Sequence, residues 1–192
     1  MSSVLVVGSV ALDSVETPFG KIDDALGGSA TFFSASASHL TKVNLVGVVG
    51  SDYPVDKLEP LRARGVDLSG LMHAEGESFR WRGRYRHDLN SAETLETRLG
   101  VFSQFRPQIP QQFRKSPYVF LGNIDPRLQL DVLDQVDKPR LVACDTMNFW
   151  IESRRPELLE LLAHVDLITI NDGEARQLTE QANLVKAARW IM

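Results

Sequence analysis

Asp13 is the first residue whose position in the chain could give it a chemical role. It follows the apolar run 4–7 after a short link, so it lies just past the expected carboxyl end of a strand, where open α/β sheets bind their ligands. A carboxylate at that point can accept hydrogen bonds from two neighbouring hydroxyl groups of a ligand. An aspartate in an ordinary turn explains the residue equally well, so Asp13 alone leaves both interpretations open.

A glycine pair, Gly27-Gly28, precedes Ser29 and a stretch of small residues with helical spacing. Two glycines let a ligand approach the backbone closely, and the amides at the start of a helix favour bound oxygen atoms. Diglycine loops without a ligand are commoner than binding loops. The pair therefore gains weight only together with other motifs.

The residue pattern disfavours several other chemistries. Gly8 stands alone after the first expected strand, where a dinucleotide-binding fold would require the spacing G-x-G-x-x-G. The histidines are scattered without acidic or cysteine partners at ligand spacing, so we expect no zinc site formed by protein ligands alone. Cys144, the one cysteine, lies in an apolar run and is expected to be a buried core residue.

The elements that must position these residues follow an α/β pattern. Short and nearly continuous apolar runs, typical of parallel strands covered on both faces, occur at 4–7, 44–49, 118–121, 141–144 and 167–170. Segments with helical spacing separate most of them. We therefore predict a three-layer α/β/α sandwich around an open, mostly parallel sheet.

Two stretches, at about 14–26 and 73–102, break this pattern with strand-like alternation. In the second, Phe79, Trp81 and Tyr85 fall on one face and four arginines fall on the other. Strands of this kind do not belong to the alternating α/β sheet. We therefore predict a small β-lid that lies over one end of it.

The charge balance limits the partners of the chain. Its formal net charge of −4 argues against nucleic-acid and membrane-surface partners, since both require a positive field. We expect the arginine stripe of the lid to face solvent or a second copy of the chain, as in a homodimer formed through the lid. The lone cysteine and the lack of a secretory signal after Met1 predict a cytoplasmic protein.

Taken in order, the motifs resemble those of the ribokinase/PfkB carbohydrate kinase family over nearly the whole chain. The features that carry the resemblance are Asp13, Gly27-Gly28, Gly50-Ser51-Asp52, Gly65-Val66-Asp67 and Asn171-Asp172-Gly173-Glu174, the last after an apolar run. The resemblance implies one ribokinase-like domain over residues 1–192. It also implies transfer of the γ-phosphate of ATP to a hydroxyl group of a sugar or nucleoside.

By this resemblance, Asp13 and the loop Gly27-Gly28-Ser29 would hold the hydroxyl groups of the substrate. Asn171 and Glu174 would order Mg²⁺ and the phosphates of ATP through water, a role that suits a cation that keeps much of its hydration. A helix cap and a first-turn acid would explain the same two residues. Both roles can hold at once.

The substrate side departs from the family pattern at two positions. Sugar kinases of this family usually carry asparagine where this chain has Ala11 and Phe32. The loss of two amide side chains removes groups that would bind sugar hydroxyls. Phe32 could instead stack on a flatter and more apolar substrate, such as a nucleoside.

The resemblance places the general base in a G-A-G-D segment, which residues 1–192 do not contain. We therefore assign no catalytic residue, expect a C-terminally truncated kinase and expect no turnover by the chain alone. Two alternatives remain open: a non-catalytic substrate-binding or dimerisation module, and half of a kinase that a second chain completes. Asp145 is the nearest alternative base within this chain.

Overall fold

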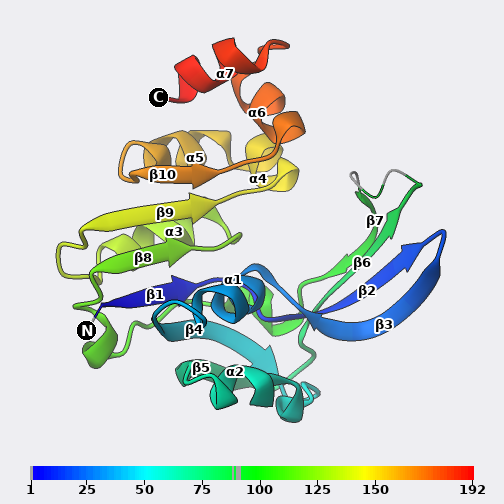
Figure 1. Ribbon diagram of the computed structural model, residues 1–192, viewed down its shortest axis with the longest axis vertical. Coiled ribbons are helices and arrows are strands. Elements are labelled where there is room, and N and C mark those ends of the chain that lie inside the picture. The colour runs from blue at the N-terminus through cyan, green and yellow to red at the C-terminus, as the bar shows by residue number, and fades with distance from the viewer. Residues whose placement is uncertain (1, 88, 90–91) are drawn as a thin grey trace.

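A computed structural model describes residues 2–87, 89 and 92–192. It shows a central sheet with helices on both faces and a smaller sheet that projects beyond one end of it (Figure 1). Within the described residues the central sheet has six parallel strands in the order β10-β9-β8-β1-β4-β5. Their bounds are β1 Ser3–Val7, β4 Lys42–Gly50, β5 Asp67–Ala74, β8 Tyr118–Leu121, β9 Leu141–Asp145 and β10 Leu167–Thr169.

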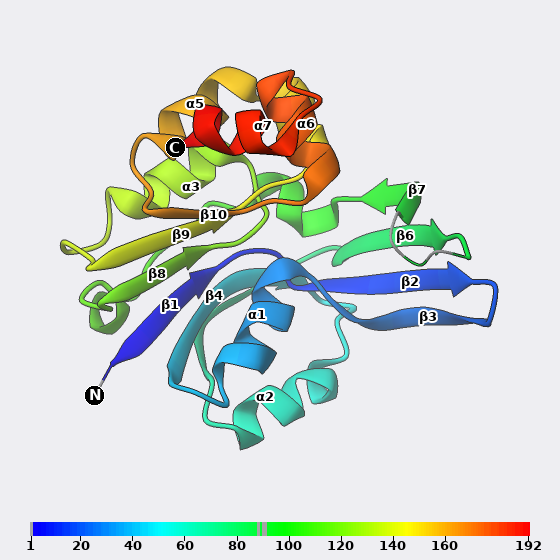
Figure 2. The ribbon, with the colours of Figure 1, turned by 45° about the horizontal axis from the view of Figure 1, so that its top comes forward.

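The helices divide between the two faces of this sheet, as Figure 2 shows. One face carries α1 (Ser29–Ala37) and α2 (Glu59–Ala63). The opposite face carries α3 (Pro126–Leu133), α4 (Asn148–Ser153), α5 (Arg155–Leu162), α6 (Asp172–Thr179) and α7 (Leu184–Ile191). The predicted three-layer α/β/α architecture is confirmed.

Strand β1 illustrates why apolar runs form the centre of the sheet. Its side chains alternate between the faces, so Val4 and Val6 pack on the α1 side, whereas Leu5 and Val7 pack on the α3 side. All four are at most 6% exposed. Such a strand needs apolar residues at every position, because neither face meets water.

The smaller sheet forms the lid. It consists of β2 (Ala11–Thr17), β3 (Gly20–Gly27), β6 (Phe79–Tyr85) and β7 (Ala92–Arg98), in the order β3-β2-β6-β7. A parallel pairing of β2 with β6 joins the two predicted stretches, which are far apart in sequence. Because β2 begins at Ala11, Asp13 lies within a lid strand rather than in a turn after β1.

The lid strands differ in their bounds from the two stretches of alternating sequence. Strands β2 and β3 together extend slightly beyond 14–26, whereas β6 and β7 occupy only the middle of 73–102. Strand β5 remains in the central sheet as far as Ala74. At the other end, Phe102, in the short 3₁₀ helix η2 (Gly100–Gln104), packs in the core of the α3 face. The chain then follows this face through a second 3₁₀ helix, η3 (Gln111–Phe113), before β8.

Strand β5 and helix α4 lie outside the elements indicated by the sequence. Four of the eight residues of β5 are exposed and three are partly covered, and Gly70 interrupts its apolar pattern. Cys144 is fully buried as predicted, and burial raises the pKa of its thiol to about 12. None of the helices in the described part of the chain is long and apolar enough to cross a membrane.

Candidate substrate and phosphate site

A cavity of about 650 Å³ lies between the lid and the carboxyl ends of the central strands. Its floor comes from loops that follow β1, β8, β9 and β10, and its wall comes from β2, β6 and β7 of the lid. The lining includes the predicted residues Asp13, Gly28, Ser29, Phe32, Asn171 and Glu174. Residues from the two ends of the sequence therefore share one cavity.

Asp13 reaches this cavity from lid strand β2 and packs against Gly27. A Cβ atom at Gly27 would lie 2.2 Å from Cγ of Asp13, so a side chain at that position would displace the carboxyl group. Burial raises the pKa of Asp13 to about 6, against the opposing effect of a hydrogen bond from the Gly28 backbone. Gly27 therefore makes room for the carboxyl group, while Gly28 faces the cavity.

Gly28 is the joint between lid strand β3 and helix α1. Its φ of 96° lies in the region that favours glycine. A Cβ atom there would lie 2.3 Å from the backbone oxygen of Ser9. The second glycine is thus required both by its conformation and by the close approach of the loop after β1.

The start of α1 differs from the expected open anion site. The backbone amide of Ser29 donates to the hydroxyl oxygen of Ser9 at 3.0 Å, and that of Ala30 donates to the backbone oxygen of Ser9 at 3.1 Å. Ser9 therefore satisfies two of the helix amides that we expected to hold ligand oxygens. Its own hydroxyl lines the cavity beside that of Ser29, 3.2 Å away.

Aromatic side chains line the lid side of the cavity. Phe79, Trp81 and Tyr85, predicted to share one face of their strand, all contribute to its lining, and Phe32 contributes from α1. Phe32 is 59% exposed, which leaves its ring accessible from the cavity. The indole N–H of Trp81 donates to the hydroxyl of Thr94 at 3.2 Å, so neighbouring strand β7 holds that ring.

Asn171 and Glu174 form a capping box at the start of α6. The amide of Glu174 donates to Oδ1 of Asn171 at 2.9 Å, and the amide of Asn171 donates to Oε2 of Glu174 at 3.0 Å. The other carboxylate oxygen of Glu174, Oε1, takes no part in the capping box. The helix cap predicted from the sequence is present. Both residues also line the cavity, so they can contact a ligand as well.

Carboxyl groups of β9 and α6 lie near one another at this end of the sheet. Burial and the charge of Glu174 raise the pKa of Asp145 to about 6, and burial also raises the pKa of Glu174. A bound cation would relieve this cost, and carboxylate oxygens are ligands that Mg²⁺ prefers. Because the described residues contain no group of three or more His, Cys, Asp or Glu that could hold a metal, such a cation would keep water ligands.

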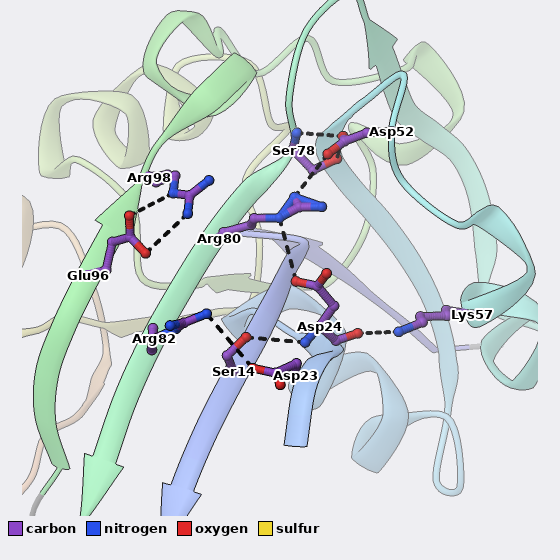
Figure 3. Close-up of polar contacts among 10 residues, drawn as sticks. All are labelled: Ser14, Asp23, Asp24, Asp52, Lys57, Ser78, Arg80, Arg82, Glu96 and Arg98. Atoms are coloured by element: carbon purple, nitrogen blue, oxygen red, sulfur yellow. Dashed lines mark hydrogen bonds and ion pairs between the residues drawn. The ribbon is translucent and has the colours of Figure 1, made fainter. Parts of the chain in front are cut away.

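Asp52 of the Gly50-Ser51-Asp52 motif lies at the base of the lid. Its Oδ1 accepts hydrogen bonds from the amide and the hydroxyl of Ser78, both at 2.7 Å, and its Oδ2 pairs with Arg80 at 2.9 Å (Figure 3). Arg80 also pairs with Asp24 of β3 at 3.5 Å. Partial burial acts to raise the pKa of Asp52. The Ser78 bonds and the Arg80 charge outweigh this effect and hold the pKa below its usual value.

Several cavity residues were missed by the sequence analysis, namely Ser9, Asn123, Met147 and Asn148. Each follows the carboxyl end of a central strand within a few residues. The rule that open α/β sheets bind ligands at those ends, applied to Asp13 alone, could have identified Asn123 and Asn148 as well. No sequence motif marks them.

The fold and the cavity together define a three-layer α/β protein with a lid-covered site for a small molecule. No protein-family model matches the chain. A cytidine kinase of Thermococcus kodakarensis is 26% identical over 195 residues, covering 100% of this chain and 69% of that protein.

Solved structures show the same fold. The nucleoside kinase of Methanocaldococcus jannaschii, an archaeal member of the ribokinase family, superposes with a TM-score of 0.72 at 18% identity, covering 98% of this chain and 68% of that one. A Burkholderia thailandensis nucleoside kinase in complex with ADP-inosine gives 0.75 at 14% identity, with coverage of 97% and 66%. The ribokinase-like fold and the resemblance to ribokinase/PfkB kinases are thereby confirmed. By this resemblance the class is that of a carbohydrate or nucleoside kinase.

Proposed function

We propose that this chain forms the substrate side and part of the phosphate side of an ATP-dependent kinase that phosphorylates a hydroxyl group of a nucleoside or sugar. One observation carries the proposal. A single cavity brings Asp13 and the diglycine loop, from the start of the chain, together with Asn171 and Glu174, from near its end. By the family resemblance, the first group of residues would bind the acceptor and the second would bind the phosphates.

Asp13 would bind the acceptor through its hydroxyl groups. At neutral pH a carboxyl group with a pKa of about 6 is mostly ionised, and a carboxylate can only accept hydrogen bonds. Partial burial strengthens each such bond, because the surroundings screen it less than water does. Gly28 and Ser29, beside it, would complete the cradle by letting the ligand approach the backbone.

Asn171 and Glu174 would act on the phosphate side. When bound, Mg²⁺ would neutralise charge on the phosphates of ATP. The capping box fixes both side chains at the start of α6, so they can order water around the cation without moving. The raised pKa values of Asp145 and Glu174 support a site that favours a positive charge.

The general base is left unassigned among residues 1–192. The resemblance places it in a G-A-G-D segment, which this sequence does not contain. Asp145 is the last residue of β9 but, in the described part of the chain, is not among the residues that line the cavity. We therefore propose that the chain alone binds its acceptor and transfers phosphate slowly or not at all.

A nucleoside acceptor is favoured over a sugar. Four aromatic side chains line the cavity, and flat bases stack on such rings, whereas Ala11 and Phe32 stand where sugar kinases usually carry amides. The names of the cytidine and nucleoside kinases that match the chain point the same way. A sugar remains the second candidate, because Asp13 would bind vicinal hydroxyls of either ligand.

A protein that binds its ligand without catalysis is the alternative to a kinase. The cavity would equally serve a non-catalytic binding module or half of a kinase completed by a second chain. For a homodimer through the lid, the support is that every residue of edge strand β7 is exposed, so its backbone is open to pairing with another strand.

Two assays on the same protein preparation distinguish the kinase from the binding module and the half-kinase. Isothermal titration with cytidine, uridine, inosine, adenosine, ribose and fructose tests acceptor binding, with glycerol as a small hydroxylated control. Transfer of label from [γ-³²P]ATP to the bound acceptor tests catalysis. We expect at least one nucleoside to bind more tightly than both sugars; a chain that binds none of them is not a kinase of this class. Binding without transfer would favour the module or the half-kinase.

A further inference from the structure

Asn123 and Trp150 connect the substrate cavity with a second hollow on the α3 face. Asn123 follows β8 and lines the substrate cavity. Trp150 of α4 lines the second hollow, of about 750 Å³, which contains none of the predicted site residues. The indole Nε1 of Trp150 lies 2.9 Å from Oδ1 of Asn123 and donates a hydrogen bond to it.

This contact determines which way the Asn123 amide faces. The nitrogen and oxygen of an asparagine amide are assigned from their hydrogen-bond partners. An indole N–H can only donate, so the amide oxygen must face Trp150 and the NH₂ group must face away. No other hydrogen bond to the Asn123 side chain is found among the described residues. Its NH₂ group is therefore the part left for a molecule in the cavity.

Helix α4 holds the indole ring in place. Ile151 is buried in the core, and the ring of Phe149 packs edge-on against Trp150 with centroids 4.8 Å apart. Glu152 accepts a hydrogen bond from Gln177 of α6 at 2.6 Å, which ties α4 to the helix that carries Glu174. A side chain positioned this firmly can fix its hydrogen-bond partner.

We infer that Asn123 is a specificity-determining residue that donates to a hydrogen-bond acceptor on the substrate, and that Trp150 is the positioning residue that fixes this orientation. The inference rests on the proposed function, because it concerns the acceptor of that same cavity. The Asp13 carboxylate can only accept hydrogen bonds from the substrate, whereas Asn123 in this orientation presents its NH₂ group, a donor, to the substrate. The substrate should thus present hydroxyl groups to Asp13 and an oxygen or nitrogen acceptor, such as a base carbonyl, to Asn123.

A double-mutant cycle tests whether Trp150 acts through Asn123. The probe is the nucleoside that the parent protein binds most tightly among cytidine, uridine, inosine and adenosine, titrated calorimetrically. We expect Trp150→Phe and Asn123→Ala each to weaken binding about tenfold, which corresponds to about 1.4 kcal/mol, one hydrogen bond. In the Asn123→Ala background, Trp150→Phe should cause no further loss. Losses that add up would overturn the positioning role.

Asn123→Asp separates recognition from packing. An aspartate keeps the shape of the side chain and still accepts the Trp150 bond, but it replaces the donor with an acceptor. We expect it to bind the probe at least tenfold more weakly than the parent. A purely structural role predicts parental affinity for Asn123→Asp, and that result would overturn the inference.

Trp190→Phe is the matched control for loss of a tryptophan. Trp190 lies on α7, is 47% exposed and packs near Arg155, away from the cavity residues. Its variant should bind as the parent does. If the parent binds none of the nucleosides and sugars, the proposed function fails and this inference with it; if it binds only a sugar, that sugar replaces the nucleoside as the probe. If the parent binds and Trp150→Phe binds equally well, only the inference fails.

Discussion

The central sheet and the lid are both β-sheets, yet different forces hold them. Central strands such as β1 are apolar on both faces and pack into two buried cores. In the lid, β7 is exposed along its whole length, and ion pairs such as Arg84–Glu16, at 3.2 Å, join half-exposed side chains. Burial of apolar area stabilises each central side chain by about 1.5–3 kcal/mol, whereas exposed ion pairs contribute about 0–1 kcal/mol.

This difference indicates how the site is divided. The central sheet supplies a fixed floor, formed by loops at the carboxyl ends of its strands. The lid brings Asp13 and the aromatic wall to that floor and depends on a small polar anchor, Asp52 with Ser78 and Arg80, for its position (Figure 3). The lid should therefore open under milder conditions than the sheet unfolds.

The largest expected effect comes from removing a central side chain. Leu5→Ala deletes a fully buried side chain of β1 and should lower the free energy of unfolding by about 2–5 kcal/mol. Leu95→Ala makes the same change in β7, where the side chain is 39% exposed, and should cost about 0.5 kcal/mol or less. Urea denaturation measures both. Equal losses would contradict the division between the two sheets.

The joint between the two regions should be nearly as sensitive. Gly28→Ala places a Cβ atom 2.3 Å from the Ser9 oxygen at a φ of 96°, and should cost at least about 2 kcal/mol of unfolding free energy. Gly65→Ala is the matched control. Its φ is 79°, but no described atom lies within 4 Å of the added Cβ, so about 1 kcal/mol is expected. A smaller loss for Gly28→Ala than for Gly65→Ala would show that the loops at the joint can separate freely.

The pH dependence of stability should have opposite signs at the cavity and at the lid anchor. Asp13 has a folded pKa of about 6 against a usual value of 3.8, so its stabilising effect is complete below 3.8 and is lost as the pH rises through about 6. Asp52, whose pKa is lowered, contributes stability above 3.8 that is lost as the pH falls through its folded pKa.

Unfolding free energies measured from pH 3 to pH 8, as parent minus variant, isolate each contribution. The difference for Asp13→Asn should fall between pH 4 and pH 7. The difference for Asp52→Asn should rise as the pH increases from 3 to 5. Profiles with the same sign would contradict the assigned environments.

The smallest change in stability should accompany the clearest change in lid motion. Asp52→Asn keeps acceptors for Ser78 but removes the charge that pairs with Arg80, which should cost about 1 kcal/mol or less. Amide hydrogen exchange in β6 and β7 should nevertheless accelerate, while exchange in β1 and β8 stays unchanged. Glu16→Gln breaks the exposed pair with Arg84 instead and should leave both exchange patterns unaltered.

Much of the fold was predictable because its signals are local. An apolar run of four or five residues identifies a strand covered on both faces, and the runs at β1, β8 and β9 fall within one residue of the observed strands. Strand β5 carries a weaker signal, since its partly exposed residues and Gly70 reduce the apolar pattern. Helix α4 is a single short element that starts at Asn148 without a side-chain cap, so neither spacing nor capping identified it.

The site was only partly predictable, because some of its features depend on tertiary contacts. Asp13 and Gly28 have recognisable motifs, but the close packing of Gly27 on the Asp13 carboxyl group is visible only once β2 and β3 pair. The orientation of Asn123 depends on Trp150, which is far from it in sequence. A motif can identify which residue types are present, but not which hydrogen bonds they have already made.

Binding by an Asp13→Ala variant tests the central claim most directly. The claim is that the cavity between the lid and the central sheet binds a hydroxylated small molecule through this carboxylate. Calorimetric titration of the tightest parental ligand at pH 7.5 should show a loss of about 1.5–3 kcal/mol, roughly 10-fold to 150-fold in Kd. Asp137→Ala, a change at an exposed aspartate, should leave the Kd unchanged. An Asp13→Ala variant that is folded and binds that ligand as tightly as the parent would contradict the account.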